Sequence, residues 1–189
     1  FRNVRKSGIA AIVLKEEDEL IEVKLTDGNR NIFIATANGQ CMRFNEKDVR
    51  SMGRVSMGVR GVSLREGDRV IGMQTDAEGG LALMVTENGL GKRTKLEEFT
   101  PHHRGGKGMI CYKINEKTGK LVGFKTVDDD CDIMMVTTGG IIIRIHAKDV
   151  SIQGRSASGV KVMNITEDVK VAGITAVEAE EETETDEEE

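Results

Sequence analysis

A glycine-rich basic loop near the middle of the chain has the residue types that bind phosphate groups. The loop consists of His102, His103, Arg104, Gly105, Gly106, Lys107 and Gly108. Glycines let the backbone approach an anion closely and present N–H groups to it, and arginine and lysine supply positive charge. The loop therefore suits a polyanion, and it carries no set of side chains for reading base edges.

Basic loops recur along the chain at nearly constant spacing. A glycine closes each loop, in steps of 50, 50 and 51 residues, at Gly8, Gly58, Gly108 and Gly159. The candidate phosphate-binding residues lie in or beside these loops and are Arg5, Lys6, Arg54, Arg60, His102, His103, Arg104, Gly105, Gly106, Lys107, Gly108, Arg155 and Lys161. If the repeats form a ring, this recurrence places the cations along one positive rim.

A hairpin motif repeats with the same step. It occupies residues 35–39, 85–89 and 136–140, and each copy ends in glycine. An arginine follows four residues after each final glycine, at Arg43, Arg93 and Arg144. Because several separate landmarks share one spacing, the sequence predicts a repeat architecture.

The second repeat predicts four short strands, over residues 58–64, 69–75, 81–86 and 90–94. We expect them to form one small antiparallel sheet, with Asn88-Gly89 in a two-residue type I′ turn that needs positive φ at both positions. The third of these strands is apolar on consecutive positions in each repeat (32–35, 81–85 and 133–136), which indicates that both of its faces are covered. Four-stranded units of this length are typical of propeller blades, whereas a helical solenoid is disfavoured because no window carries a 3.6-residue apolar stripe and the 22 glycines would weaken helices.

The acidic end of the chain changes the meaning of the net charge. The formal charge is −5, but residues 178–189 hold nine of the 32 carboxylates and no base. Without them 27 basic residues face 23 acidic ones, so the body is at +4. Since a run of like charge cannot bury itself, we expect 178–189 to be a disordered acidic tail. Such a tail either competes with a polyanion for the basic loops or only keeps the chain soluble.

Metal, membrane and catalytic sites are not expected. The three cysteines lack C-x-x-C spacing, and His102 and His103 with Cys111 lack a further ligand. No apolar run approaches the ~18 residues that cross a bilayer. An enzyme built on an axial channel would need converging carboxylates or histidines, and the chain has only three histidines.

The basic loop and the 50-residue period resemble the C-terminal domain of the DNA gyrase A protein, whose repeats include a heptapeptide of the form Q-[RK]-R-G-G-[RK]-G. The likeness covers nearly all of residues 1–177, through the repeated hairpin and the strand end at residues 95–99. By this resemblance Arg104 to Gly108 take heptapeptide positions, while His102 and His103 depart from it. The resemblance implies an all-β fold: a propeller-like β-pinwheel of ~50-residue four-stranded blades with strand exchange between blades.

The resemblance also implies a function. It is sequence-nonspecific binding and wrapping of duplex DNA around a basic rim, by an accessory domain of an ATP-dependent type II topoisomerase that supercoils DNA. Catalytic residues, ATP and Mg²⁺ would belong to the parent enzyme, and the partners would be the rest of the gyrase A protein and the ATPase subunit. The expected location is the bacterial cytoplasm, associated with the nucleoid and not with a membrane.

The expected organisation is a partial pinwheel over 1–177, with repeats near 1–49, 50–99, 100–150 and 151–177, followed by the tail. Both ends interrupt a repeat, so we interpret the chain as a piece of a longer protein. The alternatives are the related domain of topoisomerase IV, whose rim is less basic, and a propeller that serves as a protein-interaction scaffold. A scaffold would not need basic residues at the same loop of each repeat.

Overall fold

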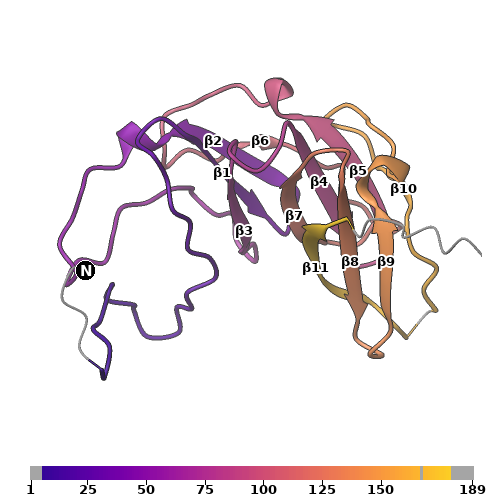
Figure 1. Cartoon of the computed structure of the whole chain (residues 1–189), viewed down its shortest axis with the longest axis horizontal. Helices are drawn as coiled ribbons and strands as arrows, with labels where there is room; N and C mark the ends of the chain where they lie inside the picture. Colours follow the sequence, from indigo (N-terminus) through magenta and orange to yellow (C-terminus); the bar gives the residue numbers. More distant parts are fainter. Residues whose placement is uncertain (1–5, 167, 180–189) are drawn as a thin grey trace, which may run out of the picture.

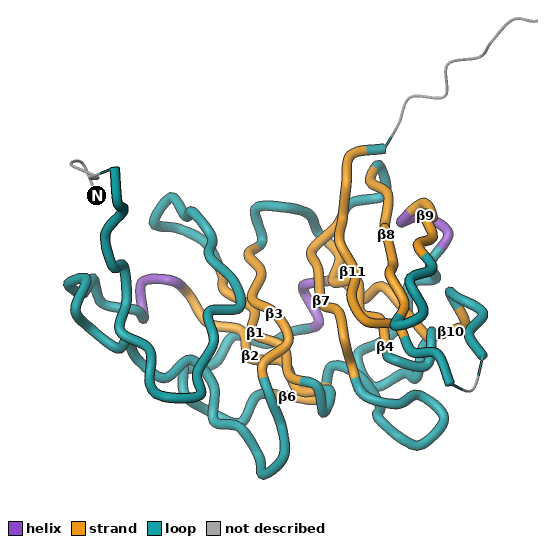
Figure 2. Tube along the Cα trace, turned by 90° about the horizontal axis from the view of Figure 1, so that it is seen from below, coloured by secondary structure: helices purple, strands orange, loops and turns teal. Residues whose placement is uncertain are grey.

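The computed structural model describes residues 6–166 and 168–179, and it is all-β as expected. Three antiparallel sheets follow one another across the molecule (Figure 1). The only helical elements among the described residues are three single 3₁₀ turns, η1 (Glu46–Asp48), η2 (Leu96–Glu98) and η3 (Ala147–Asp149). Residues 6–30 contain no strand and lie at one end of the row of sheets (Figure 2).

The sheets repeat one strand order. The first sheet has the order β3 (Val70–Thr75), β1 (Asn31–Thr36), β2 (Gln40–Asn45), β6 (Met109–Ile110). The second has the order β7 (Leu121–Val127), β4 (Leu81–Thr86), β5 (Leu90–Lys95), β10 (Val160–Lys161). The third has β11 (Val171–Glu178), β8 (Cys131–Thr137), β9 (Ile142–His146). In the first two sheets a central hairpin is flanked on both sides by strands from later in the chain, and in the third the hairpin is flanked on one side by β11.

The prediction that one repeat forms one sheet is wrong. β3 pairs with β1 of the preceding hairpin, with Met73 opposite Ile34, and not with the neighbouring β4. Residues 58–64 form no strand. The reason is that β4 is already flanked by β5 and β7, so the strand before it completes the previous sheet. Strand exchange between blades, which the resemblance implied, is thereby confirmed.

The hairpin turns also differ from the predicted type I′. Gly39 has φ of 76° and donates its N–H to Thr36 O at 3.0 Å, and Gly89 makes the same bond to Thr86 O. Among the described residues only Glu17 has positive φ without being glycine, so Asn38 and Asn88 do not. A three-residue connection with glycine last, the type I turn plus G1 bulge, accounts for this geometry.

The core lies between successive sheets, and β4 belongs to both interfaces. Ala82 and Met84 pack into the cluster that contains Phe33 of the first sheet, while Leu83 and Val85 pack into the cluster that contains Ile133 of the third. Alternate residues of a strand point to opposite faces, so a strand between two cores must be apolar throughout. The prediction that both faces of this strand are covered is confirmed for β4, whereas on β8 Val136 is exposed.

Two of the repeated hairpin arginines, Arg43 and Arg93, join their sheet to the next repeat, whereas Arg144 binds Asp132 and Glu178 O within its own sheet. Arg43 Nη1 donates to Leu96 O at 3.1 Å and to Phe99 O at 2.9 Å, at the turn η2. Arg93 donates through Nε to Val150 O at 2.7 Å, at the turn η3. Buried carbonyl groups need donors, and the guanidinium supplies several in a fixed geometry. This explains in structural terms why arginine occurs at these two positions.

Candidate nucleic-acid interface

The basic loops are linked into one row by a repeated backbone hydrogen bond. Val13 N donates to Ser56 O at 3.2 Å, and Ser63 N donates to Gly106 O at 2.8 Å. Lys113 N donates to Ala157 O at 3.4 Å in the same way. Each bond joins one loop to the segment that follows the previous loop. We call this row, residues 53–60, 102–108 and 154–161, the basic rim.

The basic rim lies at the outer edge of the sheets. The loops at 102–108 and 154–159 lead directly into β6 and β10, which are the edge strands beside β2 and β5. β3 and β7 form the opposite edges of the same sheets. Cations in the loops are therefore separated from the inner edge by the width of a sheet.

The glycine that closes each loop has a left-handed backbone. Values of φ are 73° at Gly8, 81° at Gly58, 73° at Gly108 and 76° at Gly159. A Cβ at Gly108 would lie 2.7 Å from Cys41 O, whereas at Gly58 nothing lies within 4 Å. Glycine adopts this conformation without strain. Gly108 and Gly159 turn the chain from the loop into the strand that follows it, β6 or β10.

Arg104 is a structural part of its loop as well as a cation. It is half-buried, and its guanidinium donates to Asp48 O at 2.9 Å and to Arg60 O at 3.2 Å. Gly105 N donates to Gly61 O at 2.6 Å, and Ser63 Oγ donates to Gly105 O at 2.7 Å. Arg104 is thus only partly available to an anion, because backbone carbonyls occupy two of its five donors.

Arg155 repeats this arrangement one sheet later. Its Nη1 donates to Ile110 O at 2.6 Å, and Ile110 lies 50 residues after Arg60. Its backbone N–H donates to Glu98 Oε2 at 3.1 Å. The loop arginine therefore binds the same main-chain position of the preceding repeat in both loops.

The remaining candidate residues are mostly exposed. Lys6, Arg54, Arg60, His102, His103, Lys107 and Lys161 are exposed, and Gly105, Gly106 and Gly108 are half-buried. Arg5 lies outside the described residues. The structure brings Arg60 to the 102–108 loop and places Arg155 and Lys161 in the next one. The sequence analysis missed Lys113, an exposed cation whose backbone N–H donates to the 154–159 loop. Lys113 lies 50 residues after Ser63, which makes the equivalent bond to the 102–108 loop, so the repeat spacing could have identified it.

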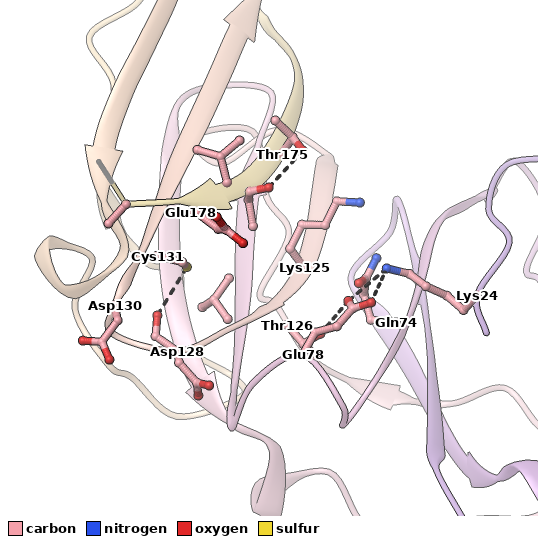
Figure 3. A pocket seen from close by; sticks show the side chains of 14 residues that line it. Lys24, Gln74, Glu78, Lys125, Thr126, Asp128, Asp130, Cys131, Thr175 and Glu178 are labelled. Atoms are coloured by element: carbon pink, nitrogen blue, oxygen red, sulfur yellow. Dashed lines mark hydrogen bonds and ion pairs between the residues drawn. The ribbon is translucent and has the colours of Figure 1, made fainter. Parts of the chain in front are cut away.

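A polar hollow lies at the inner edge of the sheets, lined by residues of β3, β7 and β11. Figure 3 shows the side chains that line it. It has a volume of about 760 Å³. Side chains at equivalent positions of successive repeats line it, namely Lys24, Gln74, Lys125 and Thr175, and the carboxylates of Glu78, Asp128 and Glu178 lie beside them. Lys24 Nζ lies 2.7 Å from Glu78 Oε1, and the buried Gln74 amide has no hydrogen-bond partner among the described residues.

This hollow holds more converging carboxylates than the sequence suggested. No histidine is among the residues that line it. Within residues 6–166 and 168–179, no group of three or more His, Cys, Asp or Glu side chains is arranged to hold a metal ion. The described part of the chain also contains no helix long and apolar enough to cross a membrane.

Comparison with known sequences finds relatives along nearly the whole chain. The family model described as DNA gyrase C-terminal domain, beta-propeller, matches residues 1–27, 30–75, 81–128 and 132–178. The chain is 44% identical over 182 residues to the DNA gyrase A protein of Staphylococcus epidermidis, covering 95% of this chain and 20% of the relative. It is 40% identical over 191 residues to the DNA gyrase A protein of Staphylococcus aureus, and this match covers 100% of the chain and 22% of the relative. The chain thus spans about a fifth of the length of these relatives.

Solved structures agree with the sequence comparison. A DNA gyrase A C-terminal domain superposes with a TM-score of 0.82 at 28% identity, covering 90% of this chain and 58% of the other. The C-terminal domain of a DNA topoisomerase IV superposes with a TM-score of 0.87 at 28% identity, and the match covers 94% of this chain and 56% of the other. The exchanged sheets, the periodic basic loops and these matches together show that the chain belongs to the DNA gyrase C-terminal domain family.

Proposed function

We propose that this chain binds duplex DNA along the basic rim without strong sequence preference, and bends it around the outer edge of the sheets. The observation that supports this most directly is the row of three loops joined by equivalent hydrogen bonds. Each loop brings exposed cations to the same edge, and DNA carries one negative charge per ~1.7 Å of helix axis. A row of cations on a scaffold of fixed spacing can follow such a backbone.

Bending DNA requires contacts on more than one loop. Turning 20–30 bp by 40–90° costs on the order of 1–6 kcal/mol. The residues that we assign to phosphate contact are Lys6, Arg54, Arg60, His102, His103, Lys107 and Lys161, with Arg5, Gly105, Gly106 and Gly108 beside them. Arg104 and Arg155 hold the loops and contribute charge. Contacts spread over successive sheets offset the cost of the bend.

The parent protein in this proposal is an ATP-dependent type II topoisomerase of bacteria, located in the cytoplasm with the nucleoid. Its partners are the ATPase subunit of the enzyme and the rest of the gyrase A protein, and ATP and Mg²⁺ belong to those parts. The topoisomerase IV domain is the second candidate, supported by its TM-score of 0.87. The curated relatives quoted above favour gyrase.

Salt dependence of binding tests the first half of the proposal. Fluorescence anisotropy of a 40-bp duplex should show affinity falling steeply between about 50 and 200 mM salt, since each neutralised phosphate adds about 0.9 to the slope of log K against log salt. Lys125→Ala is the control variant. It removes a lysine on β7, at the inner edge of the second sheet, and should bind DNA with the same salt dependence as the wild type. Flat binding across this range would overturn the proposal.

Wrapping is tested separately from binding. A nicked circular plasmid closed by ligase in the presence of the chain should show a shifted linking-number distribution, because a bent path of one hand changes writhe. A scaffold that binds other proteins would leave the distribution unchanged. If the chain binds DNA but the linking-number distribution does not shift, the DNA-binding part of the proposal stands and the wrapping part is wrong.

A further inference from the structure

A lysine is buried beneath the third basic loop. Lys92 lies on β5 with none of its surface exposed. Its Nζ donates to Gly154 O at 2.7 Å and to Arg155 O at 2.6 Å. The same nitrogen lies 4.9 Å from the ring centroid of Tyr112. The amine thus joins a strand of the second sheet to the loop that carries Arg155.

The groups around Lys92 leave its charge poorly compensated. Glu98 favours the charged amine, and Arg155 opposes it. No carboxylate within the described residues forms an ion pair with it. Removal from water dominates and lowers the pKa of Lys92 to about 8. Burial conversely raises the pKa of Cys111 to about 12 and that of Tyr112 above its usual range, so both stay protonated at mildly alkaline pH.

The equivalent position in the first sheet has a different residue. Met42 lies 50 residues earlier, on β2, and it is also buried. Its Cε packs beneath Gly106, where a Cβ would approach it to 2.9 Å. One loop is therefore supported by an apolar contact, and the next by an amine that donates to two carbonyls.

We propose that Lys92 is the positioning residue of the 154–159 loop, and that DNA binding at this loop is coupled to protonation of Lys92. This inference rests on the proposed function. A phosphate drawn to Arg155 favours a positive charge on the amine beneath it, so the bound state holds the proton more tightly than the free state. By linkage, DNA binding takes up a proton, and affinity falls as Lys92 loses its proton. The 102–108 loop, supported by Met42, lacks this coupling.

Two substitutions separate the charge of Lys92 from its packing. Lys92→Met introduces the residue that the first sheet already uses, and Lys92→Arg keeps a permanent charge with donors. Anisotropy with the same duplex at fixed salt should show the wild type binding about threefold more weakly at pH 9.5 than at pH 7.5. Both variants should bind equally at the two pH values, with Lys92→Arg the tighter of the two.

Calorimetry supplies a readout that needs no variant. Titrating DNA at pH 8 in two buffers of different ionisation enthalpy should reveal proton uptake by the wild type, and uptake should be absent in Lys92→Met. If Lys92→Met does not fold, the wild-type proton uptake and the Lys92→Arg profile decide alone. Wild-type binding that is flat with pH, or without proton uptake, overturns the coupling while leaving the DNA interface standing. Absence of binding at both pH values overturns the proposed function and the coupling together.

Discussion

The loop at 102–108 and the loop at 154–159 use one backbone design with different side chains. Each is closed by a left-handed glycine, and each is held by an arginine that binds a carbonyl of the preceding repeat. The first then adds glycines, His102, His103 and Lys107, supported from below by Met42. The second has Ser156, Ala157 and Ser158 in place of Gly105, Gly106 and Lys107, has no histidine, and is supported by Lys92. The difference shows that loop position is set by the main chain, while charge can vary from sheet to sheet.

The largest expected effect comes from breaking the shared backbone at one loop. Gly108→Ala should lower the free energy of unfolding by about 3 kcal/mol, because a left-handed alanine is strained and its Cβ would crowd Cys41 O. Gly58→Ala, in open space, should cost only about 1 kcal/mol. Chemical denaturation of both variants measures the difference, and equal losses would contradict the role assigned to the close contact.

The pH dependence of stability sharpens the comparison between Lys92 and Met42. In the unfolded chain Lys92 has its ordinary pKa near 10.4, while burial lowers the folded value to about 8. The unfolded state therefore binds more protons between these values, and stability rises with pH across that window, on the order of 2 kcal/mol. Denaturation of the wild type and Lys92→Met from pH 7.5 to 10 should show the rise only in the wild type. Parallel curves would indicate that the amine is not desolvated.

Separating the two cations of the first loop should give a smaller effect. Arg104→Ala should lose about 1–2 kcal/mol of stability, because Asp48 O and Arg60 O lose their donor. Lys107→Ala should leave stability unchanged, since Lys107 is exposed, and should weaken DNA binding several-fold. Melting temperature and anisotropy measured on both variants test this. A Lys107→Ala protein that binds as the parent does would make the loop a structural turn.

The acidic tail should have the smallest effect. Residues 180–189 lie outside the described part of the chain, and β11 includes Glu178, so truncation belongs after Ala179. We expect the truncated chain to bind DNA slightly more tightly at low salt, because a tethered polyanion competes for the basic rim. The two affinities converge at high salt, where screening removes the competition. Unchanged affinity at low salt would assign the tail a solubilising role.

Local features of this fold were predictable from the sequence, and strand partners were not. The ranges predicted for three strands agree with β3, β4 and β5 to within one residue. Alternation and turn residues identify a strand, but they carry no information about which distant strand completes its sheet. The exchange of β3 into the sheet of β1 therefore came from the family resemblance and not from the pattern.

The site was predictable to a similar depth. The loops could be located from the sequence, because glycine and the cationic residues recur at a fixed spacing and each residue type has its own role, backbone conformation for glycine and charge for arginine and lysine. The acceptors of Arg104 were not predictable, since every residue has a backbone carbonyl. Lys92 was missed because Gly91-Lys92-Arg93-Thr94 has the composition of a solvated strand end, yet β10 and the 154–159 loop cover it.

The interleaving of strands has a consequence for synthesis of the chain. The first sheet needs residues from Asn31 to Ile110, and the second needs residues from Leu81 to Lys161. As the nascent chain leaves the ribosome, the hairpin of the second sheet emerges before the first sheet can be completed. Contact order is therefore high, and pairing of β3 with the adjacent β4 competes during the delay. The repeat of the sequence is thus not a unit that can fold by itself, and adding or deleting one repeat would disturb two sheets together.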